Sequence, residues 1–179
     1  HGGTMYHIFL DRFCRGSGAV ALRSGAKLNE DWENGVPQYA EKNGDPLSNN
    51  VFFGGNLWGV AEKLEYIRSM GVNALYFNPI FKARGNHKYN TGDYMTIDPG
   101  FGTEEDFRHL CAAAHERGIR IILDGVFSHT GADSLYFNKT GSLLCDFLLV
   151  GIGEGVVLAR FTRLARFALK LTACLGLGK

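Results

Sequence analysis

Three polar residues follow an aliphatic run in the stretch RIILDGVFSHTG, namely Asp124, Ser128 and His129. A carboxylate, a hydroxyl and an imidazole just beyond a buried strand are groups that hydrogen-bond the hydroxyls of a sugar. The structural alternative is an aspartate bonded to nearby backbone and a histidine satisfied within a partial core. If the chain stays extended here, Asp124 and Ser128 point to one side and His129 to the other.

A second polar group lies in the glycine-rich stretch KARGNHKYNTGDYMTIDPGFGT, which begins at Lys82. These side chains suit a sugar, because a tyrosine ring covers its apolar face while carboxylates, amides and imidazoles bind its hydroxyl rim. The alternative is that the tyrosines only pack beneath a long loop. The side chains concerned are those of His87, Tyr89, Asn90, Asp93, Tyr94 and Asp98.

A third candidate is the adjacent pair Asp11 and Arg12, which comes soon after an apolar run at residues 5–9. Neighbouring opposite charges most simply form a local ion pair that fixes a loop. We therefore interpret this pair as structural.

Apolar segments with two different periods must position these groups. Short, mainly apolar runs predict buried strands at residues 5–9, 74–77 and 119–123, and apolar residues at helical spacing predict helices at 57–70 and 104–117. The strand–helix–strand order predicts an α/β fold with right-handed crossovers and a parallel sheet. The carboxyl ends of parallel strands meet at one edge, so the polar groups are expected there. Periodicity alone leaves open a closed barrel or an open sheet.

The helix boundaries carry local signals. Asn56 is a plausible N-cap, and Thr103 with Asp106 forms a variant of the capping box with Asp in place of the usual Glu. Gly71 and Gly118 provide the left-handed residues that commonly end helices. Residues 14–50 show no sustained period and predict a long surface loop.

The overall composition narrows the class of protein. The 179 residues carry a net charge of +1, which gives no reason to expect a nucleic-acid partner. The 45% hydrophobic and 21% charged content favours a globular domain over disorder. The four cysteines lack a C-x-x-C pair and predict reduced thiols. No signal-peptide pattern is visible, and we interpret the chain, which does not begin with Met, as a piece of a longer protein whose compartment is unknown.

Five motifs occur along the chain in the order YHIFLDRF, FFGGNLWGV, MGVNALYFNPIF, HKYNTGDYMTIDPGFGT and IILDGVFSHTG. Together they resemble the α-amylase clan of retaining glycosidases, glycoside hydrolase family 13, in its neopullulanase, maltogenic amylase and amylopullulanase branch. The resemblance covers about residues 5–141, and the ordered set is far more specific than any single motif. It implies a (β/α)₈ barrel with a small irregular domain inserted after the third strand.

The resemblance also implies roles for single residues. His129 would contact the glucose unit in subsite −1, Tyr89 would stack on it, and His87 lies beside Tyr89. Asp124 would brace an arginine from the fourth strand. The family commonly has an asparagine that binds calcium where this chain has Ser128, and a hydroxyl is a poorer calcium ligand than an amide carbonyl.

Calcium is a further expectation at a different place in the chain. Gly54 and Asn56 fall where some members of this branch bind calcium, although the flanking ligand pattern in residues 14–34 is not clear. No cofactor is expected to be required.

The catalytic residues of such an enzyme are expected downstream of this chain. Retaining glycosidases use two carboxylates about 5–5.5 Å apart, and the family places these and a third aspartate after strands four, five and seven. From about Ser142 the sequence changes to an apolar and basic tail, residues 142–179. A shifted reading frame is one interpretation. The alternatives are an amphipathic helix that could lie on a membrane surface and, least favoured, a membrane span.

The resulting functional hypothesis has two parts. The parent protein is expected to hydrolyse α-glucosidic bonds in starch, maltodextrin or pullulan-type substrates, with an α-glucan oligosaccharide or polysaccharide as its partner. Residues 1–141 would be the first portion of its catalytic barrel, without catalytic carboxylates, and so inactive alone. The alternative is a non-catalytic sugar-binding remnant or a non-functional truncated product.

Overall fold

Three parallel strands form the central sheet. The computed structural model describes residues 2–18 and 21–136, and the predicted tail at 142–179 lies outside them. The sheet has the order β1 (Thr4–Ile8), β4 (Val72–Phe77) and β7 (Arg120–Leu123). Both pairings are parallel, so the predicted strands and their direction are confirmed.

The segment predicted as one helix over residues 57–70 is two short helices, α1 (Leu57–Glu62) and α2 (Leu64–Ser69). The prediction of a continuous helix was therefore wrong. Lys63 has φ −97° and ψ 2°, and its N–H bonds the carbonyl of Val60, which tightens the turn between the helices. Asn56 caps α1 as predicted, because its side chain accepts the N–H of Gly59.

Helix α3 (Glu104–Glu116) begins with the predicted capping box. The Thr103 side chain accepts the Asp106 N–H, and the Asp106 carboxylate accepts the Thr103 N–H at 2.7 Å. Gly71 and Gly118, which follow α2 and α3, have φ values of 76° and 72°. The left-handed stops expected at these glycines are confirmed.

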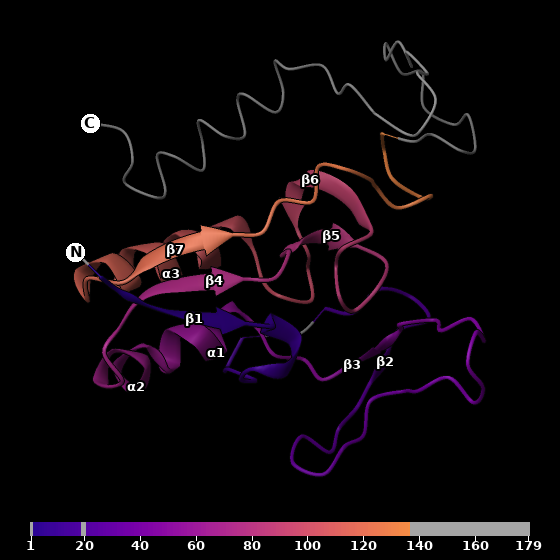
Figure 1. The fold of residues 1–179 in the computed structure, drawn as a ribbon, viewed down its shortest axis with the longest axis horizontal. Helices are drawn as coiled ribbons and strands as arrows, with labels where there is room; N and C mark the ends of the chain where they lie inside the picture. The colour runs from indigo at the N-terminus through magenta and orange to yellow at the C-terminus, as the bar shows by residue number, and fades with distance from the viewer. Residues whose placement is uncertain (1, 19–20, 137–179) are drawn as a thin grey trace.

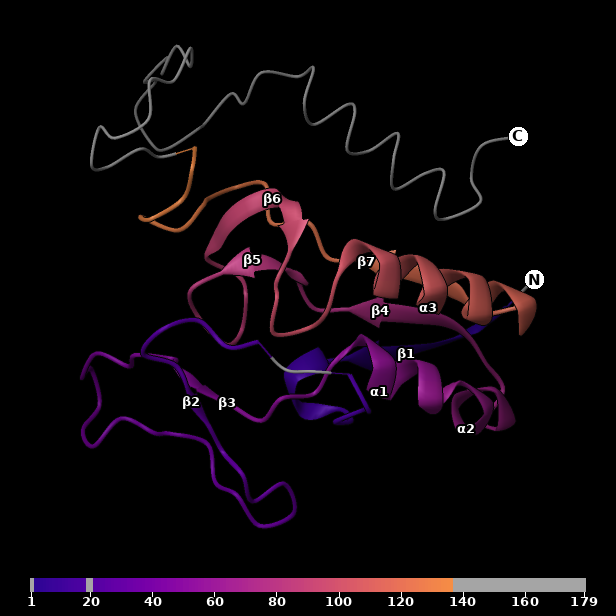
Figure 2. The same ribbon diagram turned by 180° about the vertical axis from the view of Figure 1, so that it is seen from behind.

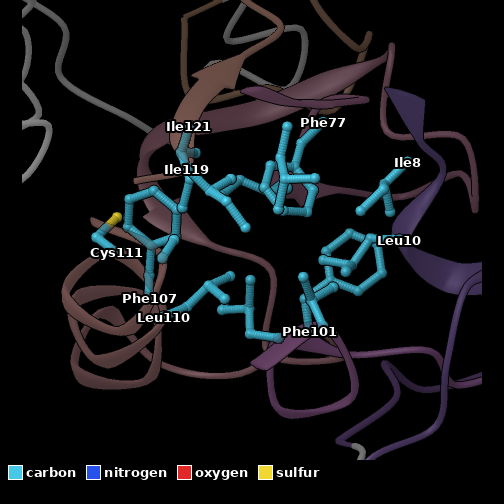
Figure 3. Packing of buried hydrophobic residues seen from close by; sticks show 14 of the residues in the cluster. Ile8, Leu10, Phe77, Phe101, Phe107, Leu110, Cys111, Ile119 and Ile121 are labelled. Carbon is cyan, nitrogen blue, oxygen red and sulfur yellow. The ribbon is translucent and has the colours of Figure 1, made fainter. Parts of the chain in front are cut away.

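The helices lie on one face of the sheet, as the two opposite views show (Figures 1 and 2). Side chains from the sheet and the helices form one core between them (Figure 3), in which Phe77, Leu110 and Ile8 are almost fully buried. On the opposite face of the sheet, Met5 and Ile122 are 58% and 42% exposed, because no described helix covers them. One covered and one open face fit the first part of a barrel whose interior is the open side.

The long segment after β1 is mainly irregular, as expected for residues 14–50. A short 3-10 helix, η1 (Leu10–Arg12), follows β1, and two short strands, β2 (Lys27–Leu28) and β3 (Val51–Phe52), pair in parallel. Of the cysteines, Cys14 and Cys111 are reduced as predicted, and Cys145 and Cys174 lie outside the described residues.

The segment that follows β4 contains a hairpin, where the sequence predicted a loop. Strands β5 (Phe81–Ala83) and β6 (Thr91–Ile97) pair antiparallel, with irregular register on either side of Lys82. The hairpin lies beyond the arrowheads of the central strands (Figure 1). It thus places the second polar group at the carboxyl ends of the sheet.

Among the described residues, none of the helices combines the length and the apolar character needed to cross a membrane.

Candidate functional site

The strand register places polar side chains in rows on the open face of the sheet. His7, Tyr76 and Ile122 are register partners on β1, β4 and β7, so their side chains share one face. Asn78 and Asp124 lie two residues further along the chain, just past the ends of β4 and β7. Their N–H groups still donate hydrogen bonds to the neighbouring strands β1 and β4. This second row is the carboxyl-end rim of the sheet.

Tyr89 connects the residues of this rim. Its hydroxyl donates a 2.9 Å hydrogen bond to Oδ2 of Asp124 and accepts a 3.3 Å hydrogen bond from Nδ2 of Asn78. Oδ1 of Asn78 in turn hydrogen-bonds Nε2 of His7. The structure therefore brings together Tyr89 and Asp124, as the sequence predicted, and adds Asn78 and His7, which the sequence analysis missed.

Two phenols beside the Asp124 carboxylate have raised pKa values. Burial, followed by the hydrogen bond and the charge of Asp124, raises the pKa of Tyr89 to about 12. Burial and then the same carboxylate also raise the pKa of Tyr76. Both phenols therefore remain protonated hydrogen-bond donors at neutral pH.

His87 lies against Tyr89, as expected. Their rings stack with centroids 6.1 Å apart and planes inclined by 24°, and the Tyr89 N–H donates to Nδ1 of His87 at 3.0 Å. Burial, and secondarily the positive charge of Lys88, lowers the pKa of His87. An imidazole that accepts at Nδ1 and is neutral carries its proton on Nε2. His87 is thus a neutral donor fixed beside the tyrosine ring.

His129 makes contacts outside this network. It is exposed, its Nδ1 hydrogen-bonds Oγ of Ser128 at 3.1 Å, and no contact described joins it to Tyr89 or Asp124. Strand β7 ends at Leu123 and the chain bends at Ser128, so the extended conformation on which the predicted alternation depends does not continue to His129.

Tyr94 has the packing role that was the structural alternative for Tyr89 and Tyr94. It is 6% exposed, and its hydroxyl donates to the carbonyls of Val126 and His129. Tyr94 thereby holds the segment after β7 against the hairpin. Tyr89, by contrast, directs its hydroxyl to the rim.

The Asp11–Arg12 ion pair is confirmed, with 3.1 Å between Oδ2 and Nε, and Asp11 has a wider structural role. Asp11 is 1% exposed, and its carboxylate accepts the N–H groups of Phe53 and Gly54 at 3.0–3.1 Å. The guanidinium of Arg12 lies 4.1 Å from the centroid of the Phe53 ring. The pair therefore anchors the chain between β3 and α1 to the end of β1.

The residues expected to contact calcium make other contacts. Oδ1 of Asn56 accepts the N–H groups of Gly59 and Gly16, while its Nδ2 donates to the carbonyls of Gly16 and Gly18 at 3.5 and 3.3 Å. Calcium requires six to eight oxygen ligands. Here the Nδ2 protons of Asn56 face the carbonyl oxygens of Gly16 and Gly18. Among the residues described, no group of three or more His, Cys, Asp or Glu side chains could hold a metal ion. The arrangement at Gly54 and Asn56 does not fit calcium.

The fold and rim together define an α/β-barrel protein with hydrogen-bonding and aromatic side chains at the carboxyl ends of its strands. The family model for the α-amylase catalytic domain matches residues 7–145. The chain belongs to this family of glycoside hydrolases, in the branch that contains amylopullulanases and maltogenic amylases.

Individual proteins support the same assignment. An amylopullulanase of Thermoanaerobacterium saccharolyticum is 45% identical over 155 residues, a match that covers 78% of this chain and 12% of that protein. An intracellular maltogenic amylase of Bacillus subtilis (strain 168) is 47% identical over 129 residues and covers 72% of this chain and 20% of its own length. The cyclic α-maltosyl-(1→6)-maltose hydrolase of Arthrobacter globiformis, solved with that sugar, matches with a TM-score of 0.62 and 35% identity. That match covers 80% of this chain and 29% of the hydrolase.

The chain therefore spans only about a tenth to a third of the length of the proteins that it matches.

Proposed function

We propose that this chain is the first part of the catalytic barrel of a retaining α-glucan hydrolase, and that it provides one wall of the sugar site. The observation that carries the proposal is the hydrogen bond from Tyr89 to Asp124 at the carboxyl rim of the parallel strands. In a barrel of this kind the loops at that rim form the active site. The substrate class is an α-glucan oligosaccharide or polysaccharide.

Each rim residue has a role that follows from its contacts. The Tyr89 ring, fixed by Asp124 at one end and stacked on His87, offers a flat apolar surface for a sugar ring. Nε2 of neutral His87 is a donor for a sugar hydroxyl. His129 is exposed beyond β7 and is proposed as a contact with the same sugar.

Asp124 is proposed as a brace and not as the nucleophile. Its Oδ2 already accepts the Tyr89 hydroxyl, and the Tyr76 phenol lies close enough to have its pKa raised by Asp124. The retaining reaction needs two carboxylates with separate roles, one as nucleophile and one as acid/base. We assign neither role to a residue of this chain, and propose that the 179 residues alone do not hydrolyse α-glucans.

The proposal is tested by binding and by activity with the purified 179-residue chain. Maltotriose should bind weakly, with a dissociation constant on the order of millimolar, and saturation-transfer NMR should detect it. Tyr89→Ala should abolish that signal, while Tyr66→Ala, which removes an exposed ring on α2, should preserve it. Binding that survives Tyr89→Ala would refute the assigned site.

Activity is measured as reducing sugar released from starch, maltodextrin and pullulan. No release above buffer is expected. Turnover that persists through purification and is lost in His129→Ala would show that the chain contains a complete catalytic apparatus, contrary to the proposal.

A further inference from the structure

Lys88 lies between two residues of the proposed sugar site and has an unusual backbone conformation. Its φ is 62°, in the left-handed region that is normally occupied by glycine. Its side chain is also only 2% exposed. A long, charged side chain is costly at such a position unless its own contacts compensate.

The Lys88 side chain runs away from the rim into the core of the hairpin. Its Nζ donates to Oδ2 of Asp98 at 2.6 Å and to the carbonyl of Ala83 at 3.2 Å. The amine also lies 4.8 and 5.2 Å from the ring centroids of Phe52 and Phe101. The buried charge is therefore paired, hydrogen-bonded and enclosed by aromatic rings.

Asp98 joins this amine to the surrounding backbone. Its Oδ2 also accepts the N–H of Ala83 at 3.2 Å, and its Oδ1 accepts the N–H of Gly100 at 3.0 Å. The N–H of Asp98 itself bonds the carbonyl of Ile80. The carboxylate thus links the end of β5, the segment just after β6 and the Lys88 turn.

Burial lowers the pKa of the Lys88 amine, and the nearby charge and hydrogen bond of Asp98, with the charge of Asp11, oppose this effect. Asp11 therefore acts on the Lys88 charge as well as holding the Phe53 and Gly54 backbone. The two carboxylates lie on different loops around the same amine.

We propose that Lys88 is a positioning residue, whose buried pairing with Asp98 fixes the turn that presents His87 and Tyr89 to the sugar. The role of this turn in sugar binding rests on the proposed function, whereas the anchoring of the turn by Lys88 does not. With the Lys88 side chain held inside, the residue before it and the residue after it lie outside at the rim. Glycine would satisfy the backbone at this position but would supply no anchor.

The first test is the reactivity of the amine in the wild-type 179-residue chain. Brief acetylation followed by peptide mass spectrometry reports the reaction of each lysine separately. The measurement can be made even when copies of the chain associate with one another. Lys88 should react at least about tenfold more slowly than the exposed Lys63 and Lys82, because its amine must first be released from the ion pair. Equal rates would overturn the proposal.

The second test separates the side chain from the backbone turn with Lys88→Gly and Lys88→Met. Glycine relieves the left-handed backbone, and methionine keeps the apolar stem without the amine. Asn49→Gly is the matched control, because Asn49 also has a positive φ, of 48°, and its carbonyl contact with the Asn86 N–H is retained in glycine.

The reporter for these variants is the nitration of Tyr89, which proceeds through the phenolate. In wild type and in Asn49→Gly, Tyr89 should be nitrated at least about tenfold more slowly than exposed Tyr39 and Tyr66, since its phenol is bound to Asp124. In both Lys88 variants the Tyr89 rate should approach that of Tyr66. Continued protection of Tyr89 in Lys88→Gly would show that only the backbone conformation of the turn matters. Continued protection in Lys88→Met would show that the ion pair does not matter. Either result overturns the proposal.

Maltotriose binding distinguishes this inference from the proposed function. Loss of Tyr89 protection together with loss of maltotriose binding in the Lys88 variants supports both. Loss of protection in a chain whose wild type binds no maltotriose supports the positioning role and refutes the sugar site.

Discussion

The Tyr89 hydroxyl donates a 2.9 Å hydrogen bond to Oδ2 of Asp124 and so joins two loops that lie 35 residues apart in the chain. The loops follow neighbouring strands β4 and β7, whose parallel pairing brings their carboxyl ends to one rim. The orientation of the tyrosine ring therefore depends on the strand register and on a carboxylate from another loop. The geometry of the proposed sugar site is consequently a property of the sheet and not of one motif.

The first prediction concerns the energy of this contact. Tyr89→Phe and Asp124→Asn should each destabilise the chain by about 1 kcal/mol, because each removes or weakens one partly exposed hydrogen bond to a charged group. The double variant should lose less than the sum of the two. A double-mutant cycle from urea unfolding measures this coupling, and strict additivity would indicate that the two side chains do not interact in solution.

The central fold could be predicted from local signals in the sequence. The strands predicted at 74–77 and 119–123 are runs of apolar residues, and each follows a glycine, Gly71 or Gly118, that ends a helix. These signals act within a few residues, and tertiary packing reinforces them. For this reason the order and direction of the strands and the capping box were predicted correctly.

The hairpin and half of the rim network could not be predicted in the same way. Strand β6 includes Gly92 and Asp93, and its pairing with β5 is irregular around Lys82, so no regular alternation marks it in the sequence. Asn78 and His7 became site residues only through the register of β1 and β4. The Asn78-Pro79 pair at the end of an apolar run is a local signal that could have indicated Asn78.

The second prediction concerns the buried carboxylate of Asp11. Asp11→Asn should lower the free energy of unfolding by roughly 2–3 kcal/mol, because one of the two oxygens that accept the Phe53 and Gly54 N–H groups is replaced by an NH₂ donor. Urea denaturation measures the change. Asp31→Asn is the control, since the exposed Asp31 carboxylate accepts only the N–H of Asn34 in this structure and should lose about 0.5 kcal/mol or less.

The third prediction concerns acid sensitivity at His87. Burial and Lys88 lower its pKa below the ordinary value of 6.5, so the unfolded chain takes up a proton before the folded chain does. Stability should therefore fall as the pH falls below about 6.5 and through the lowered pKa of His87. Protonation also removes the Nδ1 acceptor of the Tyr89 N–H.

Unfolding free energies of wild type and His87→Phe between pH 8 and pH 5 test this linkage. His87→Phe should show a smaller loss on acidification, whereas His115→Gln on α3 should retain the wild-type loss because His87 is still present. An identical acid loss in wild type and His87→Phe would assign the pH dependence to another group.

The last prediction concerns Asn56 and calcium. Its Nδ2 donates to the carbonyls of Gly16 and Gly18, so the amide itself links the loop before residue 19 to the start of α1. Excess EDTA should therefore leave the wild-type Tm unchanged.

Asn56→Asp should destabilise the chain by about 1–3 kcal/mol, because a buried carboxylate would face those two carbonyls without protons to donate. Millimolar calcium should partly restore that variant and leave wild type unaffected, because only the aspartate adds an anionic ligand beside the carbonyl oxygens. A wild-type Tm that falls with EDTA and recovers with calcium would show that these residues adopt a different, metal-bound arrangement.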